Sequence, residues 1–241
     1  MLAPRRIPVL QILNRRLVKT VGFKKPSYVG DPLNIVKIFN DKEVDELIIM
    51  DITPNALDKK PDFEFIEMLL SECQMPVGYG GGIRNVEDAQ KIIGFGAEKI
   101  IVNSLAFENS EEVAKISQRY GSQAVSFSLD YKLNFFQRYR FYKNGGQEKV
   151  KILIDNIANI IKNVNCGEII LHNINNDGHF SGFDYTLLEK IKNKINIPIV
   201  LCGGARYPQD FLEAIQKGAH SAAAGSTFIY QGSHKAVLIQ Y

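Results

Sequence analysis

The sequence lacks tryptophan, has only three cysteines among 241 residues, and contains no apolar run as long as a membrane span. Cys73, Cys166 and Cys202 lie far apart and form no CxxC pair, so neither a disulfide framework nor a zinc site is expected. A membrane helix needs about 20 apolar residues. The first apolar stretch, Ile7–Leu10, is also too short for a signal peptide. We therefore expect a reduced, cytoplasmic protein with no membrane contact and no metal or other cofactor.

The sequence also has no strong excess of charge. Its 29 Lys and Arg against 26 Asp and Glu give a net charge of +3, too small to indicate nucleic-acid binding. A local basic site would still suffice for a small anionic ligand. With 45% hydrophobic and 23% charged residues, the composition is typical of a folded globular protein. Because no Ser/Gly/Pro-rich linker interrupts it, we expect residues 1–241 to form one domain.

Short apolar runs recur along the chain, and segments with apolar residues at helical spacing separate them. A continuous apolar run is typical of a strand buried on both faces, as in a parallel sheet. Eight strand–helix units in succession predict an α/β fold, a single (β/α)8 TIM barrel. The eight runs are Ile7–Leu13, Leu47–Ile52, Val77–Tyr79, Ile100–Val102, Ala124–Leu129, Ile169–Leu171, Ile199–Leu201 and Ala222–Ala224.

An internal repeat supports the barrel. The segment Gly81–Arg84 reads GGIR, and Gly203–Arg206, which lies 122 positions later, reads GGAR. At the same offset Pro, Asp, Ile, Gly-Ala and Ser residues recur, and Glu46 corresponds to Glu168. The chain therefore reads as two half-barrels of four strand–helix units each.

Glycine pairs follow two of the predicted strands, and each is followed one unit later by a small polar pair. The glycines are Gly80–Gly82 and Gly203-Gly204, and the polar pairs are Asn103-Ser104 and Gly225-Ser226. Glycine lets backbone N–H groups approach an anion, and a helix N-terminus adds favourable dipole charge. A tight turn would explain one pair, but two related copies predict two phosphate sites at the barrel mouth.

Asp130 closes the fifth predicted strand, where a carboxylate is a reasonable general acid or base; a helix cap or a loop salt bridge is the structural alternative. Histidines give a weaker signal. His172 ends the sixth strand and is placed to point into the site, but no histidine pair has metal-ligand spacing. For each histidine we expect a non-catalytic role.

Basic residues crowd the loop that follows the first predicted strand: Arg15, Arg16, Lys19, Lys24 and Lys25. Such a loop is either solvated or a mobile lid that attracts a phosphorylated substrate.

Four charged residues precede strands at the opposite, N-terminal end of the barrel: Arg5, Glu46, Lys99 and Glu168. They predict a ring across the barrel bottom, which either stabilises the fold or receives a partner. Surface ion pairs contribute only about 0–1 kcal/mol, so we expect breaking the ring to leave folding nearly unchanged.

Motifs spread over almost the whole chain, ending near Gln231, resemble the cyclase subunit of imidazole glycerol phosphate synthase. These motifs are the opening MLAPR, Val18-Lys19, Gly30–Pro32, Asp45–Leu47, Asp51–Thr53, Gly80–Ile83, Gly121–Val125 and Asp177-Gly178. The resemblance implies a barrel with a glutaminase subunit docked on its N-terminal face. Ammonia would enter through the charged ring, cross the interior and react with a bis-phosphorylated aminoimidazole carboxamide ribonucleotide. The products would be imidazole glycerol phosphate and an aminoimidazole nucleotide.

The resemblance also assigns roles to single residues. Arg5, Glu46, Lys99 and Glu168 correspond to the ammonia gate, Lys19 to the lysine of a flexible substrate loop, and Asp130 to one of two catalytic aspartates. One phosphate site would comprise Gly82, Asn103 and Ser104, and the other Asp177, Gly178, Gly204, Gly225 and Ser226.

Gln11 departs from this family, because it occupies the position of the other catalytic aspartate. An amide does not titrate near neutral pH, and loss of an acid/base group costs a factor of about 10²–10⁴. The following segment, Leu13–Arg16, also lacks the expected Asp-Gly turn. Cyclisation is therefore expected to be weak or absent.

A divergent branch of the family fits this pattern, and Leu17–Thr20, Phe23–Pro26 and Tyr28–Pro32 resemble it. Its members pair with a glutaminase-like subunit and serve a separate amidotransferase that installs an amidine on a bacterial surface sugar, in lipopolysaccharide or nonulosonate biosynthesis. We favour this reading over a genuine cyclase of histidine biosynthesis. A barrel isomerase of the neighbouring step is a third reading. Two classes thus stay open: an ammonia-using lyase, and a non-catalytic barrel that conducts ammonia.

Overall fold

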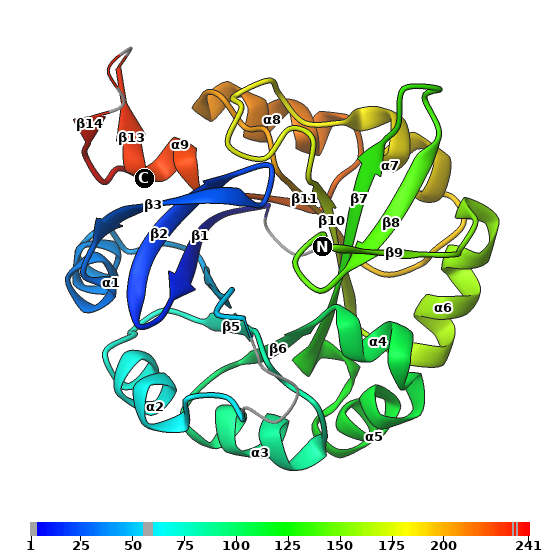
Figure 1. The fold of residues 1–241 in the computed structure, drawn as a ribbon, viewed down its shortest axis with the longest axis horizontal. Coiled ribbons are helices and arrows are strands. Elements are labelled where there is room, and N and C mark those ends of the chain that lie inside the picture. Colours follow the sequence, from blue (N-terminus) through cyan, green and yellow to red (C-terminus); the bar gives the residue numbers. More distant parts are fainter. Residues whose placement is uncertain (1–3, 55–59, 233, 235) are drawn as a thin grey trace.

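Eight parallel strands close into a barrel in the computed structural model, which describes residues 4–54, 60–232, 234 and 236–241 (Figure 1). The strand order is β10-β11-β12-β1-β4-β5-β6-β7, and pairing of β7 with β10 closes it. The predicted (β/α)8 barrel is confirmed, with each strand on its predicted run. The strands are β1 (Arg5–Leu13), β4 (Leu47–Asp51), β5 (Val77–Gly80), β6 (Lys99–Val102), β7 (Val125–Leu133), β10 (Glu168–Asn173), β11 (Ile199–Cys202) and β12 (Ser221–Ala224).

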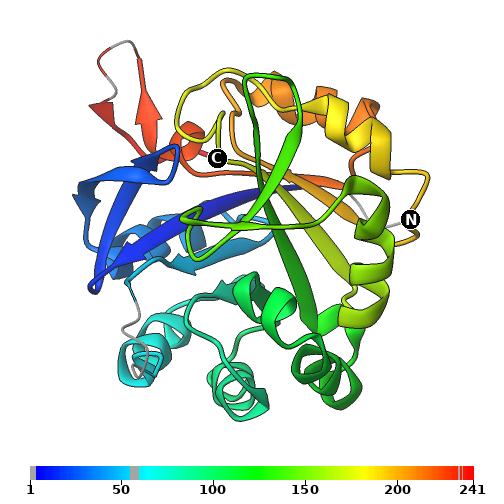
Figure 2. The same ribbon diagram turned by 45° about the vertical axis from the view of Figure 1, so that its right-hand side comes forward.

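Helices cover the outside of the barrel, as two views of the ribbon show (Figures 1 and 2). Side-chain caps begin several of them: Asp31, Asn85 and Asn109 accept hydrogen bonds from the first-turn backbone. None of the helices in the described residues is long and apolar enough to cross a membrane. The helices are α1 (Pro32–Asp41), α2 (Phe63–Ser71), α3 (Val86–Gly94), α4 (Ser104–Glu108), α5 (Ser110–Tyr120), α6 (Ile157–Val164), α7 (Tyr185–Ile191), α8 (Pro208–Gln216) and α9 (Ser226–Ile229).

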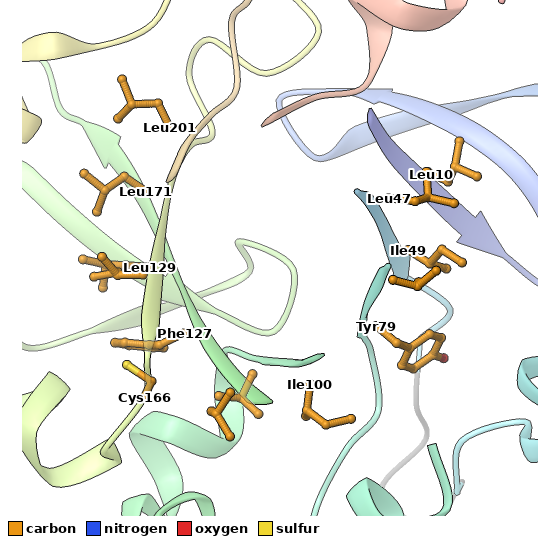
Figure 3. Packing of buried hydrophobic residues seen from close by; sticks show 14 of the residues in the cluster. Leu10, Leu47, Ile49, Tyr79, Ile100, Phe127, Leu129, Cys166, Leu171 and Leu201 are labelled. Atoms are coloured by element: carbon orange, nitrogen blue, oxygen red, sulfur yellow. The ribbon is translucent and has the colours of Figure 1, made fainter. Parts of the chain in front are cut away.

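Alternation along each strand divides the core into two clusters. Outward residues such as Leu10, Ile49 and Leu129 pack beneath the helices on both sides of the barrel (Figure 3). Inward residues form a separate interior cluster, defined as Ile7, Val9, Ile48, Ile101, Ile170, Val200, Cys202 and Ala223, with Met50 packed against it. The barrel therefore has a filled, apolar interior between its two ends.

The half-barrel repeat extends to the element boundaries. Shifting β5, α3 and β6 by 122 residues reproduces the bounds of β11, α8 and β12. The turns match as well: Asp88 accepts from the Arg84 backbone N–H at 3.1 Å, and Asp210 accepts from that of Arg206 at 2.6 Å. Each aspartate also pairs with the side chain of the same arginine. The GGIR and GGAR motifs thus build the same strand-to-helix turn twice.

Two antiparallel hairpins extend the barrel at its C-terminal face and were missed from the sequence. The segment expected as a basic loop forms β2 (Arg16–Val21) and β3 (Lys24–Gly30), with Gln11 of β1 opposite Val18. The turn between β1 and β2 places Asn14 and Arg15 at φ 50° and 62°, a left-handed pair that sequence rules associate mainly with Asn-Gly. The second hairpin comprises β8 (Tyr139–Lys143) and β9 (Glu148–Val150). Apart from the barrel sheet, β13 (Tyr230–Gln231) pairs with β14 (Ala236–Val237) in a separate two-stranded sheet.

Candidate functional site

The C-terminal ends of three neighbouring strands bring Asp130, His172 and Cys202 together. In the barrel register His172 lies opposite Asp130 on β7 and opposite Cys202 on β11. Residues paired in this way point to the same face, and all three side chains are buried. In this fold the strand C-termini carry the active site. The cluster therefore occupies the place where a catalytic centre is expected.

The surroundings of the Asp130 carboxyl group suit it to exchange protons. Its Oδ1 accepts a hydrogen bond from Ser128 Oγ at 2.7 Å and lies 3.8 Å from His172 Nδ1. Burial raises the pKa of Asp130 to about 6, against the opposing effects of His172 and the Ser128 hydroxyl. A carboxyl that titrates near this pH can act as either acid or base.

His172 is more central than the sequence suggested. Its Nε2 lies 3.6 Å from Asp177 Oδ1, and this buried nitrogen has no hydrogen-bond partner. Phe23, in the β2–β3 turn, contacts the ring edge-on at a centroid distance of 4.7 Å. Burial opposes the charged form, but Cys202, Asp177 and Asp130 raise the pKa of His172 well above its usual range. Its position at a strand end was the available signal, but no partner was visible in sequence.

Gln11 has a structural task. Its Oε1 accepts hydrogen bonds from the Thr20 backbone N–H at 3.1 Å and from Thr20 Oγ1 at 3.2 Å. These bonds tie β1 to β2 inside the mouth. The amide therefore holds the hairpin in place, and it supplies no titrating group.

Lys19 lies inside the barrel mouth. It is 4% exposed, and its Nζ donates to the Val9 carbonyl oxygen at 2.6 Å. A side chain at Gly225 would overlap Lys19 Nζ, so the glycine makes room for the ammonium group. Burial lowers the pKa of Lys19 to about 8, although Asp177 opposes this. The expectation of Lys19 in an exposed loop is thus replaced by a buried position on β2.

A small polar cavity remains between these groups. Its free space is about 10 Å³, room for about one water-sized molecule. The polar side chains on its wall are Gln11, Lys19, Thr20, His172, Asp177 and Ser226.

The residues of one expected phosphate site do meet. Asp177, Gly178, Gly204, Gly225 and Ser226 surround a second cavity. Gly178 and Gly204 have φ of 71° and 115°, a backbone region that side chains disfavour. Added side chains there would overlap the Thr20 and Gly182 carbonyl oxygens. Anion binding by this group stays a prediction.

The other expected phosphate site is already occupied by protein groups. Asn103 donates from Nδ2 to the Ser128 and Tyr142 carbonyl oxygens at 2.9 and 3.2 Å. Ser104 Oγ donates to Asn144 Oδ1 at 2.8 Å and accepts from its backbone N–H. Gly82 has φ 68° in the turn before α3. An anion here would have to displace the β8–β9 hairpin contacts or use backbone N–H groups alone.

The four charges at the barrel bottom form a closed ring. Arg5 pairs with Glu46 and, at 2.5 Å, with Glu168, while Lys99 Nζ lies 3.0 Å from Glu46 and 3.6 Å from Glu168. Ser126 donates to Glu168 at 3.0 Å. The carboxylates are 3% and 6% exposed, so these are not surface pairs. The expectation that breaking the ring leaves folding nearly unchanged is therefore wrong. Removing one partner of a buried ion pair costs about 3–5 kcal/mol of stability.

No group of three or more His, Cys, Asp or Glu residues in the described part of the chain is arranged to hold a metal ion.

The fold and site define a (β/α)8 barrel that has a charged ring at one end and a buried acid/base cluster at the other. A sequence-family model described as histidine biosynthesis protein matches residues 5–235. A Leptospira interrogans protein named putative imidazole glycerol phosphate synthase subunit HisF is 42% identical over 243 residues, covering 100% of this chain and 96% of that protein. For Pseudomonas aeruginosa hisF2, also named putative, the identity is 40% with coverage of 100% and 96%.

Imidazole glycerol phosphate synthase subunit HisF of Pyrococcus furiosus is 34% identical over 230 residues, 95% of this chain and 91% of that protein. The chain therefore belongs to the family of the imidazole glycerol phosphate synthase subunit HisF.

Replacing Lys19 by Met should stabilise the protein near pH 7. The fall in pKa from 10.5 to about 8 corresponds to a penalty of about 3 kcal/mol, and the lost bond to Val9 offsets about 1 kcal/mol. The unfolded chain keeps the Lys19 proton to higher pH than the folded chain does. The free energy of unfolding of the wild type should therefore rise between about pH 8 and 10.5. Over the same range the stability advantage of the Met variant should vanish. Urea unfolding across this range measures it; an advantage independent of pH would contradict the assignment.

Inorganic phosphate should bind first at the cavity between Gly178, Gly204 and Ser226, because the side chains of the Asn103-Ser104 site are engaged. A crystal grown in phosphate or sulfate provides the measurement. Two empty sites, with the N–H groups turned away, would count against phosphate binding at both.

Proposed function

We propose that this barrel receives ammonia from a glutaminase subunit docked on its N-terminal face and conducts it to the mouth. The observation that carries this proposal is the stacking of three layers. A charged ring lies at the bottom, an apolar interior above it, and the Asp130–His172 cluster at the top. Neutral ammonia can cross an apolar layer, whereas an ion would pay a large desolvation cost there.

The ring suits an entrance more than a stabilising device. Four charges at one end of the apolar interior cluster are expensive to bury, and apolar residues would often serve stability equally well. Relatives named as subunits of a synthase support the existence of a partner subunit.

We further propose that the ammonia serves a separate amidotransferase of surface-sugar biosynthesis. Gln11 supports this, because its amide is committed to Thr20 and cannot replace the carboxylate of a cyclase. The numbered names hisF2 and hisF3 among the relatives at 40–41% identity are compatible with an additional copy of the subunit. The alternative is a genuine cyclase in histidine biosynthesis, which the buried, titratable Asp130 favours.

Lys99→Ala should uncouple glutamine hydrolysis from ammonia use in the reconstituted complex. Without the amine, Glu46 and Glu168 lose one of the two cations between them, and the ring opens on the Lys99 side. The ratio of glutamine consumed to product formed should rise severalfold, while added ammonium salts still support product formation.

Exposed Lys115 on α5 provides the matched control, since Lys115→Ala removes the same side chain far from the ring. The ring is buried, so its loss should lower the stability of the Lys99 variant. The assay should therefore be run well below the unfolding temperature of that variant. If the ratio of glutamine consumed to product formed stays near one in Lys99→Ala, the ring has only a structural role.

Gln11→Asp should raise any cyclase activity measurably, though not fully, because it restores a carboxylate at the mouth. Ammonium-dependent turnover of the bis-phosphorylated nucleotide is the assay. Gln11→Asn is the control, because its side chain has the same length as that of the Asp variant but carries no charge. If the cyclase activity of both folded variants equals that of the wild type, the substrate pocket itself has been lost. That result would favour a barrel that only conducts ammonia.

A further inference from the structure

We propose that the hairpins at the C-terminal face form the docking surface for the enzyme that consumes the ammonia, and that this partner presents an acidic surface with an apolar recess. The proposal rests on the proposed function and adds to it the place and the chemistry of this second partner. We call residues 12–30 and 131–147 the hairpin surface. It comprises β2, β3 and β8, the turns that lead into them, and the β8–β9 turn.

The hairpin surface carries an unbalanced positive charge. It contains nine of the 29 basic residues of the chain and none of the 26 acidic residues. Arg15 and Lys143 pair with carboxylates outside it, and Lys19 is buried. Within the part of the chain that the structure describes, the other six basic side chains form no ion pair, so their charge is available to a partner. They are Arg16, Lys24, Lys25, Lys132, Arg138 and Arg140.

Two of these cations face each other across a strand pair. Lys132 of β7 and Arg140 of β8 lie directly opposite in the register, and like charges in that position destabilise a sheet. Burial and the nearby Lys24 ammonium group lower the pKa of Lys132. An anionic partner would relieve this repulsion, which no acidic residue of the hairpin surface does.

The turn between β7 and β8 adds an apolar projection. Phe135 is 93% exposed and Phe136 is 74% exposed, and their rings contact edge-on at a centroid distance of 5.6 Å. The turn lies at the edge of the molecule beside α7 (Figure 1). Neither ring contributes to the core of this chain. Aromatic side chains next to arginine are typical of the centre of a protein–protein interface.

The apolar turn and the mouth belong to one continuous surface. A side chain added at Gly146, in the β8–β9 turn, would lie 3.1 Å from the Phe23 ring, so the two hairpins are in contact. Phe23 in turn contacts His172 at the mouth. A partner that holds Phe135 and Phe136 and extends along the basic side of β8 would therefore lie over the mouth.

A protein fits this surface better than a small anion or a lipid bilayer does. A small anion would neutralise the cations but would leave both phenylalanine rings in water. A bilayer would take up the rings, yet it would cover the mouth without supplying an acceptor. An acidic protein surface with an apolar recess satisfies both features, and opposite charges on the two faces also speed association.

The test measures how the separate amidotransferase depends on this surface. Its product formation from glutamine would be followed while the concentration of this chain, in complex with its glutaminase, is varied. The double variant Phe135→Ser/Phe136→Ser should raise the concentration that gives the half-maximal rate by roughly tenfold or more. Glutamine hydrolysis, and product formation from added ammonium, should stay unchanged, because neither step uses the β7–β8 turn.

Matched substitutions elsewhere provide the controls. Leu212→Ser removes an apolar side chain that is 57% exposed on α8, and it should leave the half-maximal concentration unchanged.

Reversal of one charge tests the electrostatic part. Arg138→Glu should raise the half-maximal concentration severalfold at low ionic strength, and by less as sodium chloride is added, because salt screens exposed charges. Arg119→Glu, at an exposed position on α5, should have no effect.

An unchanged half-maximal concentration in the double phenylalanine variant would overturn the proposal. Two other occupants of the surface are tested on the chain and its glutaminase alone. Sedimentation with phosphatidylglycerol vesicles that the double variant abolishes would assign the surface to a membrane. Self-association that the double variant abolishes, measured by analytical ultracentrifugation, would assign it to a second copy. Either result would also overturn the proposal.

The outcome is separable from that of the proposed function. If the wild-type complex supports no product formation from glutamine by a separate amidotransferase, the proposed function fails and the docking surface fails with it. If the wild type and the double phenylalanine variant support it equally, only the docking surface is wrong.

Discussion

Closure of the barrel by β7 and β10 sets both ends of the molecule. Six residue pairs, from Glu168 with Ser126 to Asn173 with Tyr131, fix this register. The same ladder places Glu168 beside Ser126 in the charged ring and His172 beside Asp130 at the mouth. Because side chains alternate along a strand, a slip of one residue would turn both pairs out of the interior. The ring and the cluster therefore depend on one pairing.

Between these ends the interior is apolar, and this contrast shapes the electrostatics. Burial raises the pKa of Glu46 despite Lys99 and Arg5, and raises that of Asp130 despite His172. Charged groups at both ends are thus kept at a cost in stability. Such costs are typical of sites retained for function. Lys19, a buried cation on a backbone carbonyl, belongs to the same pattern.

The sequence was sufficient for the barrel, because apolar runs and an exact offset are local and repetitive signals. The four ring residues could be named because they precede predicted strands, but their burial could not, since it depends on how the barrel closes. The pairing of β1 with β2, which brings Lys19 into the mouth, was missed because its turn uses Asn14 and Arg15, without glycine. The central place of His172 could not be predicted from its position at a strand end. Its partners Asp130 and Asp177 come from another strand and from the following loop, and only the register brings the three together.

Channelling of ammonia is the central claim, and isotope competition tests it most directly. The complex would be given glutamine labelled with ¹⁵N in its amide, in buffer containing unlabelled ammonium, together with the acceptor. If ammonia travels from the ring of Arg5, Glu46, Lys99 and Glu168 to the mouth, the product should carry the glutamine label almost undiluted. A label diluted to the ratio in bulk solution would contradict the account.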